Sequence, residues 1–370
     1  MTAAWNAGFL NPASQHREGQ RARRELETLR TRVIDLLGGK SSSMTADQLI
    51  ITSGGTESNN LALLGLARHA RQQDPRRRQV LISAVEHPSI MGALDVLIRD
   101  GFAVDTIGVD SRGVLRLEEL EAKLSEAEES VALVSLMLAN NETGVIEPVR
   151  EAVALSHQQG AWLHTDAVQM VGKLPVNFAN LGCDALTFTA HKLHGPRGIG
   201  GLLLKHGVLP EALLFGGFQQ LGIRPGTEDV ALLTGLKSAL EIAICDVDRA
   251  ARMNELREFF ESGLLESFPD ATINGLGAPR MPHTTNVSFA GVDRQAFLMA
   301  ADFAGLAIST GSACASGSSD PSPVLLAMGA KEDVVGGSIR ISIGATTTKD
   351  ELCEALNRIR SIVEKLSKTS

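Results

Sequence analysis

The chain has 370 residues, of which 44% are hydrophobic and 21% charged, and its formal net charge is −8. These values are typical of a soluble globular protein of about two domains with a large core. The negative charge argues against a nucleic-acid backbone or an anionic membrane as partner. The chain does not open on a secretory signal, and no apolar run reaches the roughly 18 residues of a membrane span, so we expect a cytoplasmic protein.

The first two thirds of the chain alternate between predicted helices and strands. Residues 16–38 are charged and leucine-spaced and stop at two glycines, which predicts an amphipathic helix. The segments that follow are strand, turn and helix at 47–71 and 78–101, a strand at 102–110, a helix at 117–127, an apolar run with a polar loop at 131–148, a helix at 150–160, a strand at 161–170, and two strands at 183–205. Apolar strands alternating with helices indicate a mostly parallel sheet covered on both faces.

The pattern changes in the last third. The elements predicted there are one long helix or two at 234–266, strands at 284–291, 305–310 and 337–344, and a final helix at 349–366. The expected fold class is therefore α/β, with a large domain at 11–248 and a smaller α+β domain at 249–370. In such parallel sheets ligands bind at the carboxyl ends of the strands, where the polar clusters of this chain fall.

Two of these clusters place a lysine and an aspartate at the ends of successive predicted strands. Lys192 follows a strand that ends near Thr189, and a lysine with a depressed pKa can form a Schiff base. Asp166 ends the strand before it, where a lone carboxylate is costly to bury. A lysine together with a carboxylate for the pyridinium nitrogen is how proteins hold this cofactor. The alternatives are an exposed loop lysine and a helix N-cap aspartate.

Further polar residues end neighbouring predicted strands. Gly54, Gly55 and Thr56 lie between a strand and a helix, where backbone amides and a hydroxyl group can bind a phosphate group. His87 could stack on a planar cofactor, and Asn141 could bind a ring hydroxyl group. The alternatives are an ordinary strand–helix turn, a satisfied loop histidine and a turn-forming asparagine.

The cysteines point to reactivity rather than cross-linking. The four cysteines lie far apart without a C-x-x-C pair, which argues against a disulfide framework or a metal site and for a reducing compartment; they are Cys183, Cys245, Cys314 and Cys353. Cys314 stands in the small-residue segment ISTGSACASGSSDP, which offers no apolar surroundings. Small neighbours would let this thiol move between two places.

Eight motifs follow one another along the chain: TSGGTESNN, EHPSI, NNETG, HTDAVQ, TAHKLHGP, RPGTE, STGSACAS and SIRISIG. In this order they resemble the NifS/IscS-type cysteine desulfurases, which are class V aminotransferase-like, fold-type I pyridoxal phosphate enzymes. The resemblance implies conversion of L-cysteine to L-alanine, with the sulfur passing to Cys314 as a persulfide. It also implies a sulfur-acceptor protein, such as an iron–sulfur scaffold.

The resemblance assigns a role to each candidate residue. Lys192 would hold the cofactor and move the α-proton, and Arg340 would bind the substrate carboxylate, although a surface ion pair is the alternative for Arg340. His87 would also act in catalysis, and Asn141 would lie at the substrate. The residues implied to bind the cofactor are Gly55, Thr56, His87, Asn141, Asp166, Gln169, Thr189, His191, Lys192 and Thr227, the last from the second subunit of a homodimer. No metal is implied.

Two features depart from the family pattern. Family members begin with an arm containing L-D-x-x-[AS]-T-T, and here only residues 1–10 precede Asn11, so we expect a truncated arm. Gln219 and Gln220 also differ from the usual residues, and no role is carried over to them. Two other functions stay open: a selenocysteine lyase or aminotransferase on the same fold, and an impaired paralogue that acts as a partner protein.

Overall fold

The computed structural model describes residues 1–311 and 320–367, and the chain divides into two compact units. The large unit comprises Met1–Ile107, Leu117–Leu138 and Pro148–Asp246, and the small unit comprises Gly108–Arg116, Ala139–Glu147 and Val247–Ser370. Two short segments of the small unit are thus inserted between strands and helices of the large one. Among the described residues, no helix is long and apolar enough to cross a membrane.

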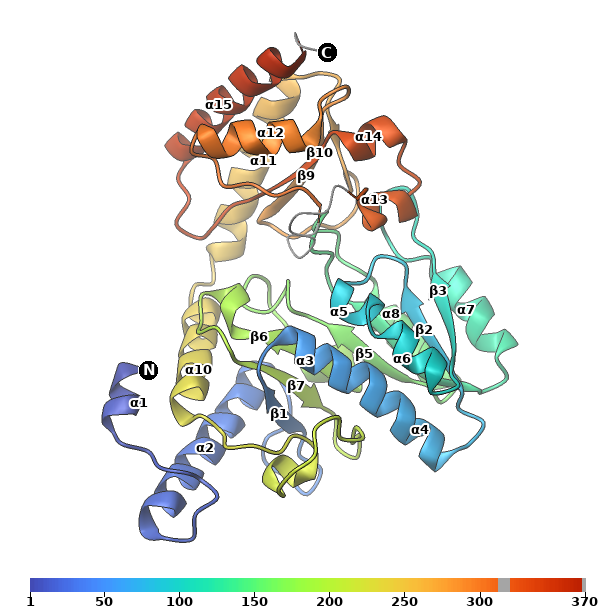
Figure 1. Cartoon of the computed structure of the whole chain (residues 1–370), viewed down its shortest axis with the longest axis vertical. Helices are drawn as coiled ribbons and strands as arrows, with labels where there is room; N and C mark the ends of the chain where they lie inside the picture. Colours follow the sequence, from blue (N-terminus) through green and yellow to red (C-terminus); the bar gives the residue numbers. More distant parts are fainter. Residues whose placement is uncertain (312–319, 368–370) are drawn as a thin grey trace. The chain divides into compact units, whose positions relative to one another are not determined.

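A seven-stranded sheet forms the centre of the large unit, in the order β1-β7-β6-β5-β4-β2-β3 (Figure 1). Its strands are β1 (Gln48–Thr52), β2 (Gln79–Ser83), β3 (Ala103–Ile107), β4 (Val131–Met137), β5 (Trp162–Asp166), β6 (Ala185–Thr189) and β7 (Gly200–Leu204). Strands β2 to β6 pair in parallel, whereas β7 is antiparallel to both of its neighbours. This mostly parallel sheet confirms the predicted α/β fold class.

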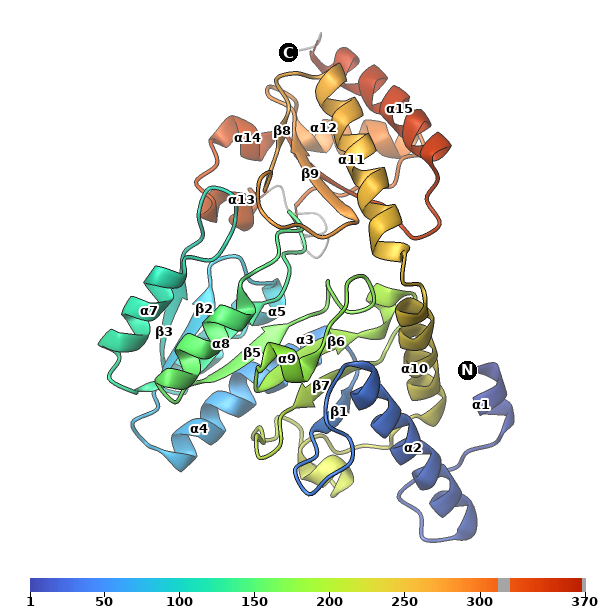
Figure 2. The same ribbon diagram turned by 180° about the vertical axis from the view of Figure 1, so that it is seen from behind.

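Helices cover both faces of this sheet. Helices α3 and α4 cross one face and α8 and α9 the other, as the two opposite views show (Figures 1 and 2). The helical elements of this unit are α1 (Thr2–Asn6), α2 (Arg17–Leu36), α3 (Gly55–Asn60), the π-helical η1 (Leu61–Leu66), α4 (Ala67–Gln73), α5 (Pro88–Met91), α6 (Leu94–Arg99), α7 (Leu117–Glu126), α8 (Val149–Gln158), α9 (Phe178–Leu181), the 3₁₀ turns η2 (Ala190–Leu193) and η3 (Gln219–Gly222), and α10 (Val230–Cys245).

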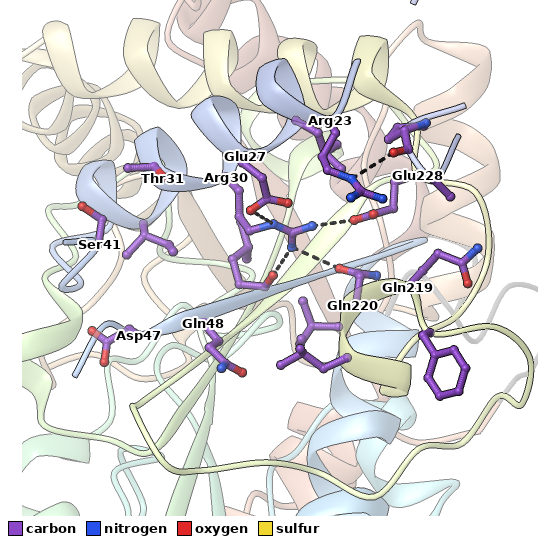
Figure 3. Close-up of a pocket in the computed structure, with 18 residues that line it drawn as sticks. Arg23, Glu27, Arg30, Thr31, Ser41, Asp47, Gln48, Gln219, Gln220 and Glu228 are labelled. Atoms are coloured by element: carbon purple, nitrogen blue, oxygen red, sulfur yellow. Dashed lines mark hydrogen bonds and ion pairs between the residues drawn. The ribbon is translucent and has the colours of Figure 1, made fainter. Parts of the chain in front are cut away.

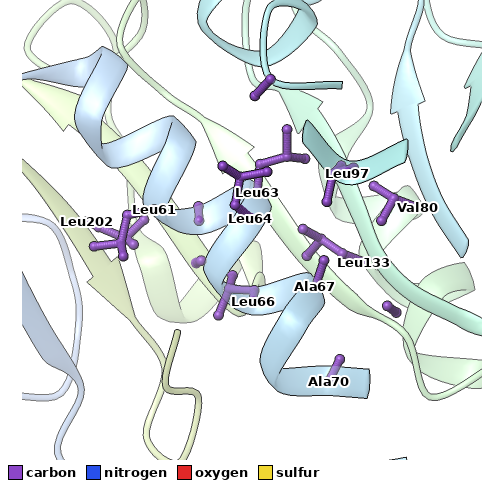
Figure 4. Packing of buried hydrophobic residues seen from close by; sticks show 14 of the residues in the cluster. Leu61, Leu63, Leu64, Leu66, Ala67, Ala70, Val80, Leu97, Leu133 and Leu202 are labelled. Carbon is purple, nitrogen blue, oxygen red and sulfur yellow. The ribbon is translucent and has the colours of Figure 1, made fainter. Parts of the chain in front are cut away.

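The π-helical turn within the predicted helix has a local cause. The Glu211 N–H group donates to the Gly65 carbonyl oxygen at 3.0 Å, so an outside donor engages a helix carbonyl group. A Cβ atom at Gly65 would lie 2.6 Å from the Glu211 carbonyl oxygen, so only glycine fits there. All six residues of η1 are buried, and Figure 4 shows its leucines packed among residues of the sheet, such as Leu133 and Leu202. This segment is apolar on every side because protein surrounds it.

The small unit contains a three-stranded antiparallel sheet in the order β10-β9-β8. Its elements are α11 (Arg249–Ser267), β8 (Thr272–Ile273), β9 (Thr284–Ser288), α12 (Arg294–Phe303), α13 (Pro323–Ala327), α14 (Glu332–Gly336), β10 (Ser338–Ser342) and α15 (Lys349–Ser367). The predicted helical region 234–266 is therefore two helices, one of the two alternatives.

The prediction of a strand at 305–310 is wrong. Gly305 has a φ of +75°, and the Leu306 N–H group donates to the Ala301 carbonyl oxygen at 2.8 Å, so the start of the segment ends α12 instead. Only Ser309 pairs with a strand, through a single bridge to Arg340.

Side chains cover the outer edge of β1, which is an edge strand. The Ile51 N–H group donates to Gln220 Oε1 at 2.6 Å, and Gln220 Nε2 donates to the Ile51 carbonyl oxygen at 2.9 Å. The carboxamide group thus takes the place of a neighbouring strand. Arg30 donates to the Leu49 carbonyl oxygen and pairs with Glu228 at 2.5 Å (Figure 3). These bonds attach residues 220–228 to β1 and α2.

A cavity of about 660 Å³ lies beside this edge, lined by residues of α2, β1 and 218–221. None of the candidate site residues that the structure describes lines this cavity. Gln220 has a φ of +49°, a left-handed conformation that is unfavourable for a residue with a Cβ atom. Its paired hydrogen bonds to Ile51 offset that cost.

Removal of the Gln220 carboxamide should loosen this edge. We expect Gln220→Ala to lower the free energy of unfolding by about 1–3 kcal/mol, because three backbone groups lose a partner: the Ile51 N–H and carbonyl groups and the Arg224 carbonyl group. Hydrogen exchange should report faster exchange at the Ile51 amide. Gln219→Ala is the matched control, because among the described residues that side chain accepts a single long hydrogen bond, from the Gly226 N–H group at 3.4 Å. Equal exchange at Ile51 in both variants would contradict this role.

Candidate active site

The strand register brings two of the predicted clusters together. Residue Gly200 of β7 pairs with Thr52 of β1 on one side and with Thr189 of β6 on the other. The glycine turn that follows β1 is therefore held next to the end of β6. A Cβ atom at Gly200 would lie 2.8 Å from the Gly54 Cα atom, so this approach depends on glycine.

The glycine turn leads into the N-terminus of α3. Gly54 precedes the helix without a side-chain cap, Gly55 begins it, and Thr56 is exposed. Helix N-terminal N–H groups without a side-chain acceptor favour an anion. Glu57 accepts from the Ser53 N–H group at 2.7 Å and from Arg224 Nε at 2.8 Å. These bonds tie the turn to the segment that contains Thr227, which is itself exposed.

Three candidates lie at the end of β6. The Thr189 hydroxyl group donates to the Ile199 carbonyl oxygen at 3.1 Å and lies 3.1 Å from His191 Nδ1. The 3₁₀ turn η2 then carries His191 and Lys192 outward, and both are exposed. Partial burial and nearby cations, Lys192 first among them, lower the pKa of His191. Strand β6 ends at Thr189, as predicted, and Lys192 and the glycine-rich segment follow it.

Asp166 ends the adjacent strand β5 and is buried. Its Oδ2 accepts from Asn59 Nδ2 at 2.6 Å, and its Oδ1 accepts from the Val168 N–H group at 2.9 Å. Burial raises the pKa of this carboxyl group, and the two hydrogen bonds oppose that rise. No ion pair of Asp166 with lysine or arginine occurs in the described part of the chain. Gln169 lies three residues further on and is half-buried.

His87 caps the short helix α5. Its Nδ1 atom accepts from the Ser89 N–H group at 3.1 Å and lies 2.8 Å from Ser89 Oγ. Burial lowers the pKa of His87, the negative charge of Asp166 raises it, and the positive charge of Lys192 lowers it. The histidine is therefore part of the same polar cluster as Asp166 and Lys192.

The other described candidates belong to the small unit. Arg340 Nη1 donates to the Asn141 carbonyl oxygen at 2.9 Å, so these two residues are in contact. The neighbouring Asn140 shapes the turn, since its Oδ1 atom accepts from the Glu142 and Thr143 N–H groups at 2.8 and 2.9 Å. Cys314 lies outside the described residues.

Sequence reasoning missed three polar residues of this site. Asn59 and Ser89 connect Asp166 to His87, and Arg224 ties the glycine turn to the segment of Thr227. Asn59 stands inside the TSGGTESNN motif and Ser89 inside EHPSI, so motif membership was their only signal.

Comparison with known proteins identifies the family of the chain. The sequence profile of the family "Aminotransferase class-V" matches residues 3–354. The chain is 38% identical over 359 residues to the cysteine desulfurase IscS of Dictyoglomus turgidum, covering 97% of this chain and 88% of that protein. It is 37% identical to the cysteine desulfurase NifS of Azotobacter vinelandii, covering 98% and 88%.

The fold is also shared with solved structures. A NifS-like protein from Rickettsia africae superposes with a TM-score of 0.84 at 30% identity, over 96% of this chain and 92% of that one. The match to the family profile and the identity to the two desulfurases both span nearly the whole chain. The chain therefore belongs to the class V aminotransferase family, and within it to the cysteine desulfurases of the NifS and IscS type.

Proposed function

We propose that this cysteine desulfurase binds pyridoxal phosphate in the large unit and transfers the sulfur of L-cysteine to Cys314. The observation that carries the proposal is Asp166, a buried carboxylate without a cationic side chain paired to it among the described residues. Each of its oxygens accepts one hydrogen bond and retains a lone pair. A protonated pyridine nitrogen is a cationic donor that fits this acceptor.

The rest of the donor set fits the same cofactor. A phosphate group suits the uncapped N-terminus of α3, with hydroxyl groups at Thr56 and Thr189 beside it. We assign Gly55 and His191 to the same group, and Gln169 and Asn141 to the ring hydroxyl. Lys192 lies on the turn after Thr189, where an exposed amine can reach a carbonyl carbon.

The chemistry then divides among the residues of this chain. When bound, pyridoxal phosphate supplies an electron sink for negative charge at the substrate α-carbon. Lys192 removes the α-proton, and Arg340 holds the carboxylate of L-cysteine. The Cys314 thiolate attacks the substrate sulfur, so an S–S bond forms as the C–S bond breaks. The products are L-alanine and a persulfide on Cys314, and the atoms and electrons balance without another reactant.

We also propose a homodimer in which Thr227 reaches the phosphate group of the second subunit. Exposed apolar side chains on the same segment support this, namely Phe215, Phe218 and Leu221 with 89%, 97% and 70% of their surface exposed. A sulfur-acceptor protein, such as an iron–sulfur scaffold, completes the proposed reaction. A cytoplasmic location follows from the cysteine pattern of the sequence.

Two variants should separate cofactor binding from sulfur transfer. Lys192→Ala should lower desulfuration by about 10²–10⁴-fold, since it removes the base, and should shift the visible absorbance of the bound cofactor. Cys314→Ala should keep that absorbance and lose the protein persulfide, measured by mass spectrometry after L-cysteine is added. The matched control is Cys353→Ala, because Cys353 is an exposed thiol on α15.

The outcomes of this experiment are distinct. Equal desulfuration by Cys314→Ala and the wild type would contradict the role of Cys314. Faster turnover of selenocysteine or another amino acid than of L-cysteine would favour a different reaction of the same fold. A wild-type protein without bound cofactor or turnover would favour the partner-protein alternative.

The substrate carboxylate provides a further test. Arg340→Lys should raise the KM for L-cysteine by about 10–100-fold and change kcat less, because lysine cannot form the planar pair of hydrogen bonds. Steady-state kinetics measure both constants. Arg358→Lys, on the exposed side of α15, is the control. A change in kcat alone would assign Arg340 to the chemical step instead.

A further inference from the structure

Asn59 lies at the centre of a hydrogen-bonded chain that joins two candidate residues. Its Nδ2 atom donates to Asp166 Oδ2 at 2.6 Å and to Ser89 Oγ at 2.8 Å. Ser89 Oγ in turn lies 2.8 Å from His87 Nδ1. Asn59, Ser89 and Asp166 are all buried, with 1%, 8% and 6% of their surface exposed.

The direction of each hydrogen bond follows from the chemistry of the groups. The reverse orientation of the Asn59 amide would place its oxygen against a carboxylate oxygen, so the nitrogen faces Asp166. Both protons of that nitrogen are then in use. Ser89 Oγ accepts one of them, and its own proton is left to donate to His87 Nδ1.

The same geometry determines the tautomer of His87. The Ser89 N–H group also points at Nδ1, at 3.1 Å. Two donors directed at one ring nitrogen require that nitrogen to be unprotonated. The neutral ring therefore carries its proton on Nε2.

We propose that Asn59 and Ser89 are positioning residues that hold Asp166 as a charged acceptor and His87 as the neutral Nε2–H tautomer. The roles of Asp166 and His87 toward cofactor and substrate rest on the proposed function, whereas the hydrogen-bonded chain rests on geometry alone. Neither Asn59 nor Ser89 belongs to the set of residues that the family resemblance implies.

These hydrogen bonds oppose the effect of burial at Asp166 and act in the same direction as burial at His87. Burial raises the pKa of Asp166 and lowers that of His87, and among the described residues the charges of Asp166 and Lys192 also act on His87. The bond from Asn59 lowers the pKa of Asp166, which favours the carboxylate needed opposite a pyridinium nitrogen. The bonds from Ser89 favour neutral His87, because an imidazolium ring would need a proton on Nδ1.

The sign of each change can be predicted. Loss of the Ser89 hydroxyl group removes a donor that favours the neutral ring, so the pKa of His87 should rise. Loss of the Asn59 amide removes a donor that favours the carboxylate, so the pKa of Asp166 should rise and a cationic cofactor ring should bind less tightly.

The first experiment measures which ring nitrogen of His87 carries the proton. Protein labelled with ¹⁵N-histidine is titrated with acid, and the two nitrogen signals of His87 are identified by their loss in His87→Gln. We expect the wild type to show an unprotonated Nδ1 and a protonated Nε2 near neutral pH. Ser89→Ala should raise the pKa of His87 by about 0.5–1, and Ser89→Thr should restore it.

Asn60→Ala is the matched control for this measurement. Asn60 is the same residue type on the same helix, and its Nδ2 donates to the carbonyl oxygens of Thr56 and Ser89, both at 2.9 Å. It should leave the nitrogen signals of His87 unchanged. A protonated Nδ1 in the wild type, or the same pKa in Ser89→Ala and the wild type, would overturn the proposal.

The second experiment measures the affinity for pyridoxal phosphate. Asn59→Ala should raise the Kd about 10–100-fold, whereas Asn60→Ala should not. If Asn59→Ala does not fold, as judged by circular dichroism, Asn59→Leu keeps the volume of the side chain and lacks both donors. An unchanged Kd in a folded Asn59 variant would overturn the role of Asn59.

Failure of the proposed function would look different. In that case the wild type would bind no cofactor or release no sulfur from L-cysteine. The histidine signals need neither event, so they test the hydrogen-bonded chain independently. A wild type that desulfurates L-cysteine but shows no effect of Ser89→Ala would retain the function and overturn the inference.

Discussion

The site depends on one constraint: a carboxylate at the end of β5 that is buried without a cationic side chain paired to it among the described residues. Such a group is unfavourable by itself, and two hydrogen bonds from Asn59 and the Val168 backbone compensate only part of the cost of burial. The remaining cost makes Asp166 a strong acceptor for a cationic ligand. Asn59, on the helix after the glycine turn, donates to this carboxyl group, and the charges of His87 and Lys192 favour its ionised form.

The sheet brings these parts together through its one antiparallel inner strand. Because β7 runs against both β1 and β6, those two strands point the same way and end at the same edge. Gly200 lies between Thr52 and Thr189, and its lack of a Cβ atom lets the glycine turn approach β6. The phosphate-binding candidates and the lysine turn thus share an edge although about 130 residues separate them in the sequence.

Most of the fold could be predicted because the spacing of apolar residues along the sequence indicates which face of a helix or strand is buried. The strands β4, β5 and β6 are nearly continuous apolar runs, and polar residues follow where they end, so the sequence indicates Asp166 and Lys192 as candidates. Asn59, Ser89 and Gln220 could not be found in this way. Asn59 and Gln220 bond to partners 107 and 169 residues away, and Ser89 links its neighbour His87 to Asn59, which is 30 residues away. No spacing rule encodes such pairings. The prediction of a strand at 305–310 is wrong for a related reason. The apolar residues of this segment pack after the end of α12 and not in a strand.

The burial and location of the three described cysteines bear on which cysteine acts as the nucleophile. Cys183 is buried, and burial raises its pKa well above the usual range of a thiol, so it does not supply a thiolate near neutral pH. Cys245 and Cys353 are exposed on the helices α10 and α15, whose backbones are regular. A thiol fixed to a helix can move only as far as its side chain allows, whereas sulfur transfer needs a thiol that reaches a substrate and then an acceptor. We propose Cys314 for this role, because its small-residue sequence context is the one among the four cysteines that offers no apolar surroundings.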